Sequence, residues 1–202
     1  MKLYWSPKTR SSRALWMLEE AGVDYDLELV DIGAVARQDS AEFLEASPMG
    51  KVPALADGDV KMSESSAICL YIADRYSPGN LAPAIDDPLR GKFLYWLMYT
   101  PAVVEPAMSE KFSGTETNRF RSGWGDFDLM IETLEKGIAG KTWILGEQFT
   151  AADVMLGSST VFLRLFKMLP DSPALDAYAD RCLARPAYQK VLELNEASAG
   201  KS

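Results

Sequence analysis

The stretch GKVPALADGDVKM, residues 50–62, places a proline at the start of what otherwise reads as a buried strand. Two short apolar runs flank Asp57-Gly58, and an Asp-Gly pair between apolar runs is a strong signal for a β-hairpin. Proline lacks a backbone donor, so within sheets it is confined to edges, first positions and turns. Pro53 is therefore expected at the mouth of a hairpin. The Val52–Pro53 bond there is either an ordinary trans bond or a cis bond that holds a sharp turn.

The segments around this hairpin alternate between strand and helix patterns. Residues 2–5 suit a short strand, residues 11–22 a helix that stops at a glycine, and residues 25–31 an alternating strand. A short helix over residues 40–46 precedes the hairpin, and a strongly patterned helix over residues 64–76 follows it. The order β-α-β-α-β-β-α predicts a parallel pair with a right-handed crossover plus an antiparallel hairpin, in one mixed four-stranded sheet.

After a proline-rich linker the chain shows helix patterns and no convincing strand. We therefore predict an α/β domain followed by an all-α domain. The domains and linker are expected at residues 1–77, 78–87 (linker) and 88–202. Helices in the second domain are expected over residues 90–111, 120–138, 150–166, 172–184 and 187–197.

The segment FTAADV, residues 149–154, carries a helix-start signature within this second domain. Thr150 and Asp153 stand at capping-box spacing, and Phe149 and Val154 stand at the spacing of a hydrophobic staple. A helix cap contributes about 1 kcal/mol to stability. We interpret Asp153 as a structural residue and not as an active-site acid.

Composition excludes several classes of function. The chain has 202 residues, of which 21 are Lys or Arg and 29 are Asp or Glu, so its net charge is −8. An acidic chain is a poor general binder of nucleic acid or anionic membranes. No window reaches the ~18 apolar residues of a membrane span and the first residues lack a signal-peptide pattern, so we expect a cytoplasmic protein.

The chain contains no histidine, which removes the commonest general base and metal ligand. Serine-histidine triads, cysteine-histidine dyads and ordinary zinc hydrolase sites are therefore excluded. Cys69 and Cys182 both fall in apolar helix patterns, which favours buried structural thiols over a disulfide or a redox pair.

Three segments of the first domain are expected to meet at one end of the sheet. One is Ser63-Glu64-Ser65 at the start of the last helix of that domain. A helix N-terminus attracts a carboxylate, and a glutamate beside it can pair with an ammonium group, so the two together suit an α-amino acid head group. Alternatively, Ser63 and Glu64 simply cap the helix.

The second segment is the turn at Val52 and Pro53. A cis bond there turns the Val52 peptide groups outward, where they can bind an extended peptide as a short added strand. Lys51 is placed beside them to meet a ligand carboxylate.

The third segment, SPKTRSSR, residues 6–13, is rich in hydroxyls near a helix start. Such hydroxyls usually cap the helix, and this reading holds for each of them. A hydroxyl aimed at a bound thiol would instead donate a hydrogen bond to its thiolate, helped by the helix dipole and by Arg10 or Arg13. Each unit of decrease in the thiol pKa from ~8.5 corresponds to about 1.36 kcal/mol.

Together these parts resemble the cytosolic glutathione transferases over nearly the whole chain. In that family a thioredoxin-like first domain binds glutathione and a helical second domain supplies the pocket for an electrophile. The resemblance rests on SPMGKVPAL (residues 47–55), ADGDVKMSESSAICLYIADRY (residues 56–76) and FTAADV. It implies glutathione as co-substrate, no metal or redox cofactor, and a homodimer.

The resemblance also implies roles for individual residues. Glu64 and Ser65 would hold the γ-glutamyl end, the Val52 backbone beside cis Pro53 the cysteinyl unit, and Lys51 with Gln38 the glycine carboxylate. The sequence departs from the family at Ser47, where an asparagine is usual, and it has no cysteine in the first turn. The second departure disfavours the cysteine-bearing classes of the family.

Three residues compete for the role of activating hydroxyl. Alignment on Arg13 places Thr9 where the theta, delta and phi-like classes carry their serine. Ser11 is the neighbouring alternative, and Tyr4 resembles the tyrosine of the mu-like class although it falls inside the first strand.

The aromatic and methionine-rich stretch LYWLMYTPAVVEPAM, residues 94–108, suggests where the electrophile binds. Tyr95, Met98 and Tyr99 are expected to line an adaptable apolar pocket. We predict a glutathione S-transferase that conjugates glutathione to small electrophiles. Glutathione-dependent peroxide reduction or dehalogenation, and non-catalytic binding by a transferase-like regulatory protein, remain alternatives.

Overall fold

The computed structural model describes residues 1–33, 40–115 and 118–198, which pack as two compact units. The first, here called the sheet unit, falls within Met1–Leu81 and Ala184–Ser202. The second, here called the helical unit, is Ala82–Leu183. The last helix therefore packs with the first domain, although it follows the second along the chain. The predicted domain boundaries at residues 77 and 88 divide the chain by its order along the sequence, and they stay a prediction.

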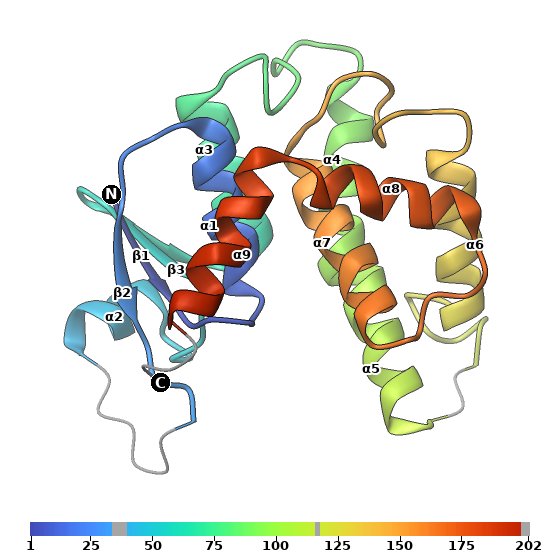
Figure 1. Cartoon of the computed structure of the whole chain (residues 1–202), viewed down its shortest axis with the longest axis horizontal. Helices are drawn as coiled ribbons and strands as arrows, with labels where there is room; N and C mark the ends of the chain where they lie inside the picture. The colour runs from blue at the N-terminus through green and yellow to red at the C-terminus, as the bar shows by residue number, and fades with distance from the viewer. Residues whose placement is uncertain (34–39, 116–117, 199–202) are drawn as a thin grey trace. The chain divides into compact units, whose positions relative to one another are not determined.

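A mixed four-stranded sheet lies at the centre of the sheet unit, as the sequence predicts (Figure 1). The strand order is β2-β1-β3-β4. β1 pairs in parallel with β2 and antiparallel with β3, and β3 forms the predicted hairpin with β4. The strands are β1 (Lys2–Trp5), β2 (Asp26–Leu29), β3 (Ala54–Asp57) and β4 (Val60–Ser63).

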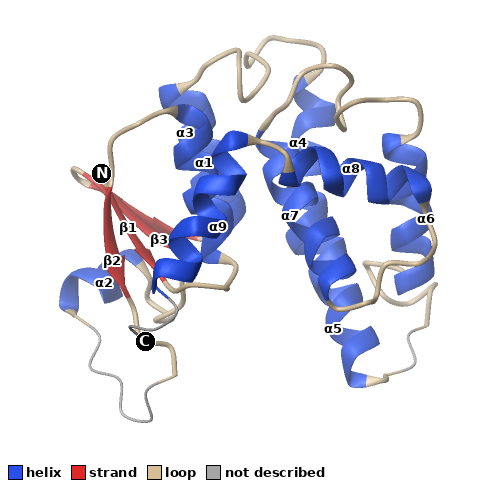
Figure 2. Ribbon diagram, viewed as in Figure 1, coloured by secondary structure: helices blue, strands red, loops and turns tan. Residues whose placement is uncertain are grey.

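Different helices pack on the two faces of this sheet, because successive side chains along a strand point to opposite sides. On one face Leu3 and Leu55, which are register partners, are fully buried. On the other face Tyr4 and its partner Ala54 pack with Phe43 in a separate core cluster. The helices of the sheet unit are α1 (Ser11–Ala21), α2 (Ala41–Ala46), α3 (Ser65–Tyr76) and α9 (Pro186–Ser198), with α9 beside α1 (Figure 2).

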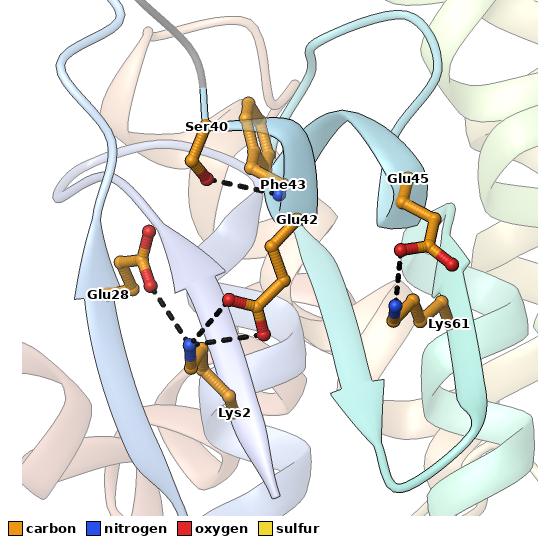
Figure 3. A network of polar contacts seen from close by, with 7 residues as sticks. All are labelled: Lys2, Glu28, Ser40, Glu42, Phe43, Glu45 and Lys61. Atoms are coloured by element: carbon orange, nitrogen blue, oxygen red, sulfur yellow. Dashed lines mark hydrogen bonds and ion pairs between the residues drawn. The ribbon is translucent and has the colours of Figure 1, made fainter.

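Short helix α2 is held to its face of the sheet by charged side chains (Figure 3). The Lys2 ammonium lies 3.2 Å from the Glu42 carboxylate and 3.3 Å from that of Glu28. Hydrogen bonding to Glu42 and Glu28 raises the pKa of Lys2. A second ion pair joins Lys61 of β4 to Glu45 of α2. Each of these part-exposed pairs adds little to stability, but together they fix the orientation of the helix that leads into the 47–53 loop.

The helical unit contains α4 (Arg90–Tyr99), a π-helical turn (Thr100–Val104), α5 (Glu105–Ser113), α6 (Phe127–Ile138), α7 (Ala151–Leu165) and α8 (Pro173–Leu183). Residues 90–111 are thus helical as predicted, but a π turn that the sequence analysis did not predict divides them into α4 and α5. Pro101 lacks the N–H that the helical ladder needs, and a π turn absorbs the defect. The start predicted at residue 120 was too early. Asp126 caps α6 by accepting the Leu129 N–H at 2.8 Å.

The predicted capping box of α7 is confirmed, with the Thr150 and Asp153 side chains both bonded to the opposite backbone amide. The structure adds two partners that the sequence motif does not show. Asp153 is fully buried and also accepts the Ile144 N–H at 2.8 Å and the Tyr178 hydroxyl at 2.9 Å. Its role is structural, and it ties α7 to α8 and to the preceding loop.

Cys69 and Cys182 are both buried, and neither forms a disulfide bond, as predicted. Throughout the part of the chain that the structure describes, no helix is both long and apolar enough to cross a membrane.

Candidate functional site

Strand register brings the three predicted segments to one end of the sheet. Tyr4 of β1 pairs with Ala54 of β3, which in turn pairs with Ser63 of β4. Because β3 is antiparallel to both neighbours, the end of β1, the start of β3 and the end of β4 lie side by side. The turn after β1, the Val52–Pro53 turn and the start of α3 therefore converge within the sheet unit.

The turn after β1 is braced from inside by Ser11. This residue is fully buried, and its hydroxyl accepts the Ser6 N–H at 3.1 Å and donates to the Ser6 carbonyl at 2.8 Å. The two bonds close the turn across five residues. The Ser11 hydroxyl is thus engaged within the protein.

Thr9 presents the more accessible hydroxyl of this turn. Its side chain is half-buried, and its Oγ1 lies 2.8 Å from the Ser6 carbonyl oxygen and 2.7 Å from Ser11 Oγ. The Ser11 N–H donates to it at 3.2 Å. Because α1 begins at Ser11, Thr9 stands at a helix N-terminus, where the dipole favours negative charge.

Tyr4 lies in a different environment. Its side chain is fully buried, and its ring packs against Phe43 with centroids 5.3 Å apart. Burial raises the pKa of Tyr4. Its ring belongs to the core beneath α2, and the β1–α1 turn that carries Thr9 and Ser11 lies outside that cluster.

The loop that leads to Pro53 is organised by Ser47. This buried side chain accepts the Lys51 N–H at 2.9 Å and donates to the Lys51 carbonyl at 2.8 Å. The Gly50 N–H also donates to the Ser47 carbonyl, at 2.8 Å. Although the sequence departs from the family's usual asparagine here, the serine hydroxyl makes a donor-acceptor pair that fixes the loop.

The Val52–Pro53 bond is cis, as the resemblance to the family implies. Val52 is half-buried and Lys51 is exposed, so both remain accessible beside the start of β3. Gln38, predicted to help Lys51, lies outside the described residues.

The N-terminus of α3 lacks a side-chain cap. Glu64 occupies the N-cap position with φ 74° and ψ 118° and makes no capping hydrogen bond. A positive φ is uncommon for a residue other than glycine, and such outliers concentrate at functional sites. The alternative in which the Glu64 side chain caps the helix therefore does not hold, and a helix N-terminus without such a cap suits an anion. Glu64 is exposed and Ser65 is half-buried beside it.

The predicted pocket residues all lie at the end of α4 in the helical unit. Tyr95 is 52% exposed and Met98 is 40% exposed, so both present apolar surface. Tyr99 is buried, its hydroxyl lies 3.4 Å from the Met130 carbonyl, and burial raises its pKa to about 12. Of the three pocket candidates, Tyr95 and Met98 are thus exposed, and Tyr99 belongs to the core.

The sheet topology and the all-helical unit match the thioredoxin-like first domain and helical second domain expected from the sequence. Comparisons with known proteins agree. The glutathione S-transferase N-terminal domain model matches residues 1–74, and the corresponding C-terminal domain model matches residues 93–181. The chain is 31% identical to glutathione S-transferase 1 of Zea mays, over 98% of this chain and 99% of that protein. The chain therefore belongs to the glutathione S-transferase family.

Bacterial proteins are among the other relatives. Glutathione S-transferase GstA of Escherichia coli O157:H7 is 25% identical, over 95% of this chain and 97% of its own length. Among solved structures, a sphingomonad glutathione S-transferase complexed with glutathione superimposes with a TM-score of 0.81 at 29% identity, covering 97% of this chain and 99% of that one. The bacterial transferase BphK gives the same TM-score at 26% identity, covering 97% and 100%.

Proposed function

We propose that the protein conjugates the glutathione thiolate to small electrophiles, and that the sheet unit alone holds the glutathione. The observation that carries this proposal is the convergence at one sheet end of the Thr9 turn, the Val52–Pro53 turn and the uncapped N-terminus of α3. Family membership and the relatives named glutathione S-transferase support the same activity.

Each part of glutathione then has a matching group. The α-carboxylate of the γ-glutamyl unit binds the free amides and hydroxyl at Ser65, and its ammonium group pairs with Glu64. The cysteinyl unit pairs with the Val52 backbone as a short added strand. The exposed Lys51 meets the glycine carboxylate.

Thr9 is the residue that activates the thiol in this proposal. The Ser6 carbonyl oxygen already has a second donor, Ser11 Oγ, at 2.8 Å. Rotating the Thr9 hydroxyl hydrogen toward a bound sulfur therefore leaves that carbonyl with a partner. A hydrogen bond to the thiolate, together with the α1 dipole, favours the ionised form and lowers the thiol pKa. Ser11 acts as the brace that holds Thr9 in place.

The electrophile binds to apolar surface of the helical unit in this proposal. Tyr95 and Met98 are its lining candidates because both are exposed, whereas Tyr99 supports them from the core. Tyr95 and Tyr99 rings lie 5.6 Å apart between centroids, so the surface is an aromatic one. We also propose a cytoplasmic homodimer that uses glutathione as co-substrate and needs no metal or redox cofactor.

A pair of assays tests this function. The purified protein should be retained on immobilised glutathione and should conjugate chlorodinitrobenzene. Activity confined to cumene hydroperoxide would favour the peroxidase alternative, and retention without either activity would favour a binding protein. Loss of retention altogether would contradict the glutathione site.

Replacing Ser47 by alanine should raise the Kd for glutathione by about 5- to 20-fold, because both Lys51 backbone groups lose their partner and the 50–53 loop becomes less ordered. Isothermal titration of the folded variant measures this change. Ser47→Asn, which restores a donor and an acceptor, should recover part of the affinity. An alanine variant with unchanged Kd would show that the loop does not depend on this side chain.

A further inference from the structure

The last helix reaches back to the turn that carries Thr9. Asn195 of α9 accepts the Lys8 N–H at 2.7 Å through Oδ1, across 187 positions of sequence. It also bonds with the Ser12 hydroxyl at 3.2 Å and donates to the Val191 carbonyl of its own helix at 2.9 Å. Asn195 is only 6% exposed, although it is seven residues from the end of the chain. A buried amide of this kind is retained only where its hydrogen bonds are met.

The backbone that Asn195 holds is an unusual one. Lys8 has φ 57°, in the left-handed region that a residue with a side chain rarely adopts. Such a conformation is strained and persists where neighbouring groups over-determine it. The Lys8 N–H bond to Asn195 is one such constraint, and it is placed directly before Thr9. The Thr9 side chain is held in turn by the Ser11 N–H, which donates to Thr9 Oγ1.

We propose that Asn195 is a positioning residue for thiol activation. It holds Lys8 in the left-handed conformation and Ser12 at the start of α1, and thereby sets where the Thr9 hydroxyl points. This inference rests on the proposed function, in which Thr9 donates to the glutathione thiolate. Asn195 touches neither the sulfur nor any other part of glutathione.

Other contacts along the same helix pair serve as an internal control because they lie far from the turn. Arg185, the residue directly before α9, pairs with both oxygens of Glu20 at the opposite end of α1, at 2.5 and 2.6 Å. Tyr188 packs on Trp16 with ring centroids 4.6 Å apart. These contacts join α9 to α1 without reaching Lys8 or Thr9. They let a general loosening of α9 be distinguished from loss of the Asn195 hydrogen bonds to Lys8 and Ser12.

The test compares Asn195→Leu and Asn195→Ala with Arg185→Ala, using the full chain. Each is assayed for the pKa of the bound glutathione thiol, from ultraviolet thiolate absorbance against pH, and for the pH profile of kcat/KM with chlorodinitrobenzene. Both Asn195 variants should raise the thiol pKa by about 0.5 to 1 unit, which lowers kcat/KM at pH 6.5 by about 3- to 10-fold. Glutathione KM should change less than kcat. Arg185→Ala should lower the Tm and leave the thiol pKa unchanged.

Asn195→Asp keeps an acceptor for the Lys8 N–H and should hold the thiol pKa closer to the wild-type value than leucine does. In a Thr9→Val background, Asn195→Leu should add no further change, because it acts through Thr9. If Thr9→Val raises the thiol pKa but both apolar Asn195 variants leave it unchanged, this inference is overturned and the role of Thr9 stands. If Thr9→Val itself leaves the pKa unchanged, both proposals fail together.

Discussion

Valine in place of Thr9 is expected to raise the thiol pKa of bound glutathione by about 1 to 2 units and to lower kcat/KM at pH 6.5 by about 10- to 100-fold. The physical reason is the loss of the half-buried Thr9 hydroxyl, which in this proposal donates to the sulfur at the start of α1. Valine has nearly the shape of threonine, so the turn should keep its packing. Glutathione affinity should change little, because most of the tripeptide binds elsewhere.

The sign of the pH effect follows from the same argument. Below the thiol pKa the reactive thiolate fraction falls tenfold for each unit of pH, so a raised pKa moves the ascending limb of the kcat/KM profile to higher pH. The variant should therefore approach wild-type activity as the pH rises above 8. Thr9→Ser keeps the hydroxyl and is the matched control, which should retain most activity.

Ser11 provides the competing outcome. The structure assigns its hydroxyl to both backbone groups of Ser6, so Ser11→Ala should lower the Tm by loosening the turn. If Ser11→Ala instead raises the thiol pKa while Thr9→Val is silent, Ser11 is the donor. The alignment on Arg13 would then be wrong by two positions.

The fold of the sheet unit could be predicted from sequence because its signals are local. Asp57-Gly58 between apolar runs specifies the β3–β4 hairpin, and the glycine at position 22 ends α1 in the left-handed conformation, with φ 63°. The hairpin and the β1-α1-β2 crossover each specify one pair of strands. The pairing of β1 with β3, which places the candidate site at one end of the sheet, was not specified by either motif.

Features that depend on distant or competing contacts were not predicted. The π turn at Thr100 arises where a favourable apolar helix pattern meets the missing donor of Pro101, and the pattern alone predicts an unbroken helix. The bonds of Asn195 join residues 187 positions apart, and a single asparagine near the end of a helix carries no sequence signal for such a partner. Gly50 and Ser47 stand in the recognised loop motif, yet the Ser47 hydroxyl bonds that brace it are visible only in three dimensions.

Asp153→Asn is expected to destabilise the protein by about 3 to 5 kcal/mol, because it leaves buried donors without an acceptor. One carboxylate oxygen accepts from Ile144 and Tyr178, and the other accepts the N–H and hydroxyl of Thr150. Asparagine offers one oxygen only, so its NH2 group must face a buried backbone N–H, which is also a donor. Urea unfolding measures the loss. Tyr178→Phe removes a single bond and should cost about 1 kcal/mol.

The difference in unfolding free energy between wild type and Asp153→Asn should depend on pH. Its direction tests whether burial or hydrogen bonding has the larger effect on the pKa of the Asp153 carboxyl. Burial raises the pKa of Asp153 to about 6, and it outweighs the donors from Ile144, Thr150 and Tyr178 that lower it. Between about pH 4 and pH 6 the native state therefore keeps a proton that the unfolded chain has released. The stability that this group contributes falls as the pH rises through that window, by at most about 3 kcal/mol. Asparagine does not titrate, so the stability gap between wild type and Asp153→Asn should narrow from pH 4 to pH 6. A gap that widens over this range would mean that the donors outweigh burial and that the pKa of Asp153 lies below its ordinary value.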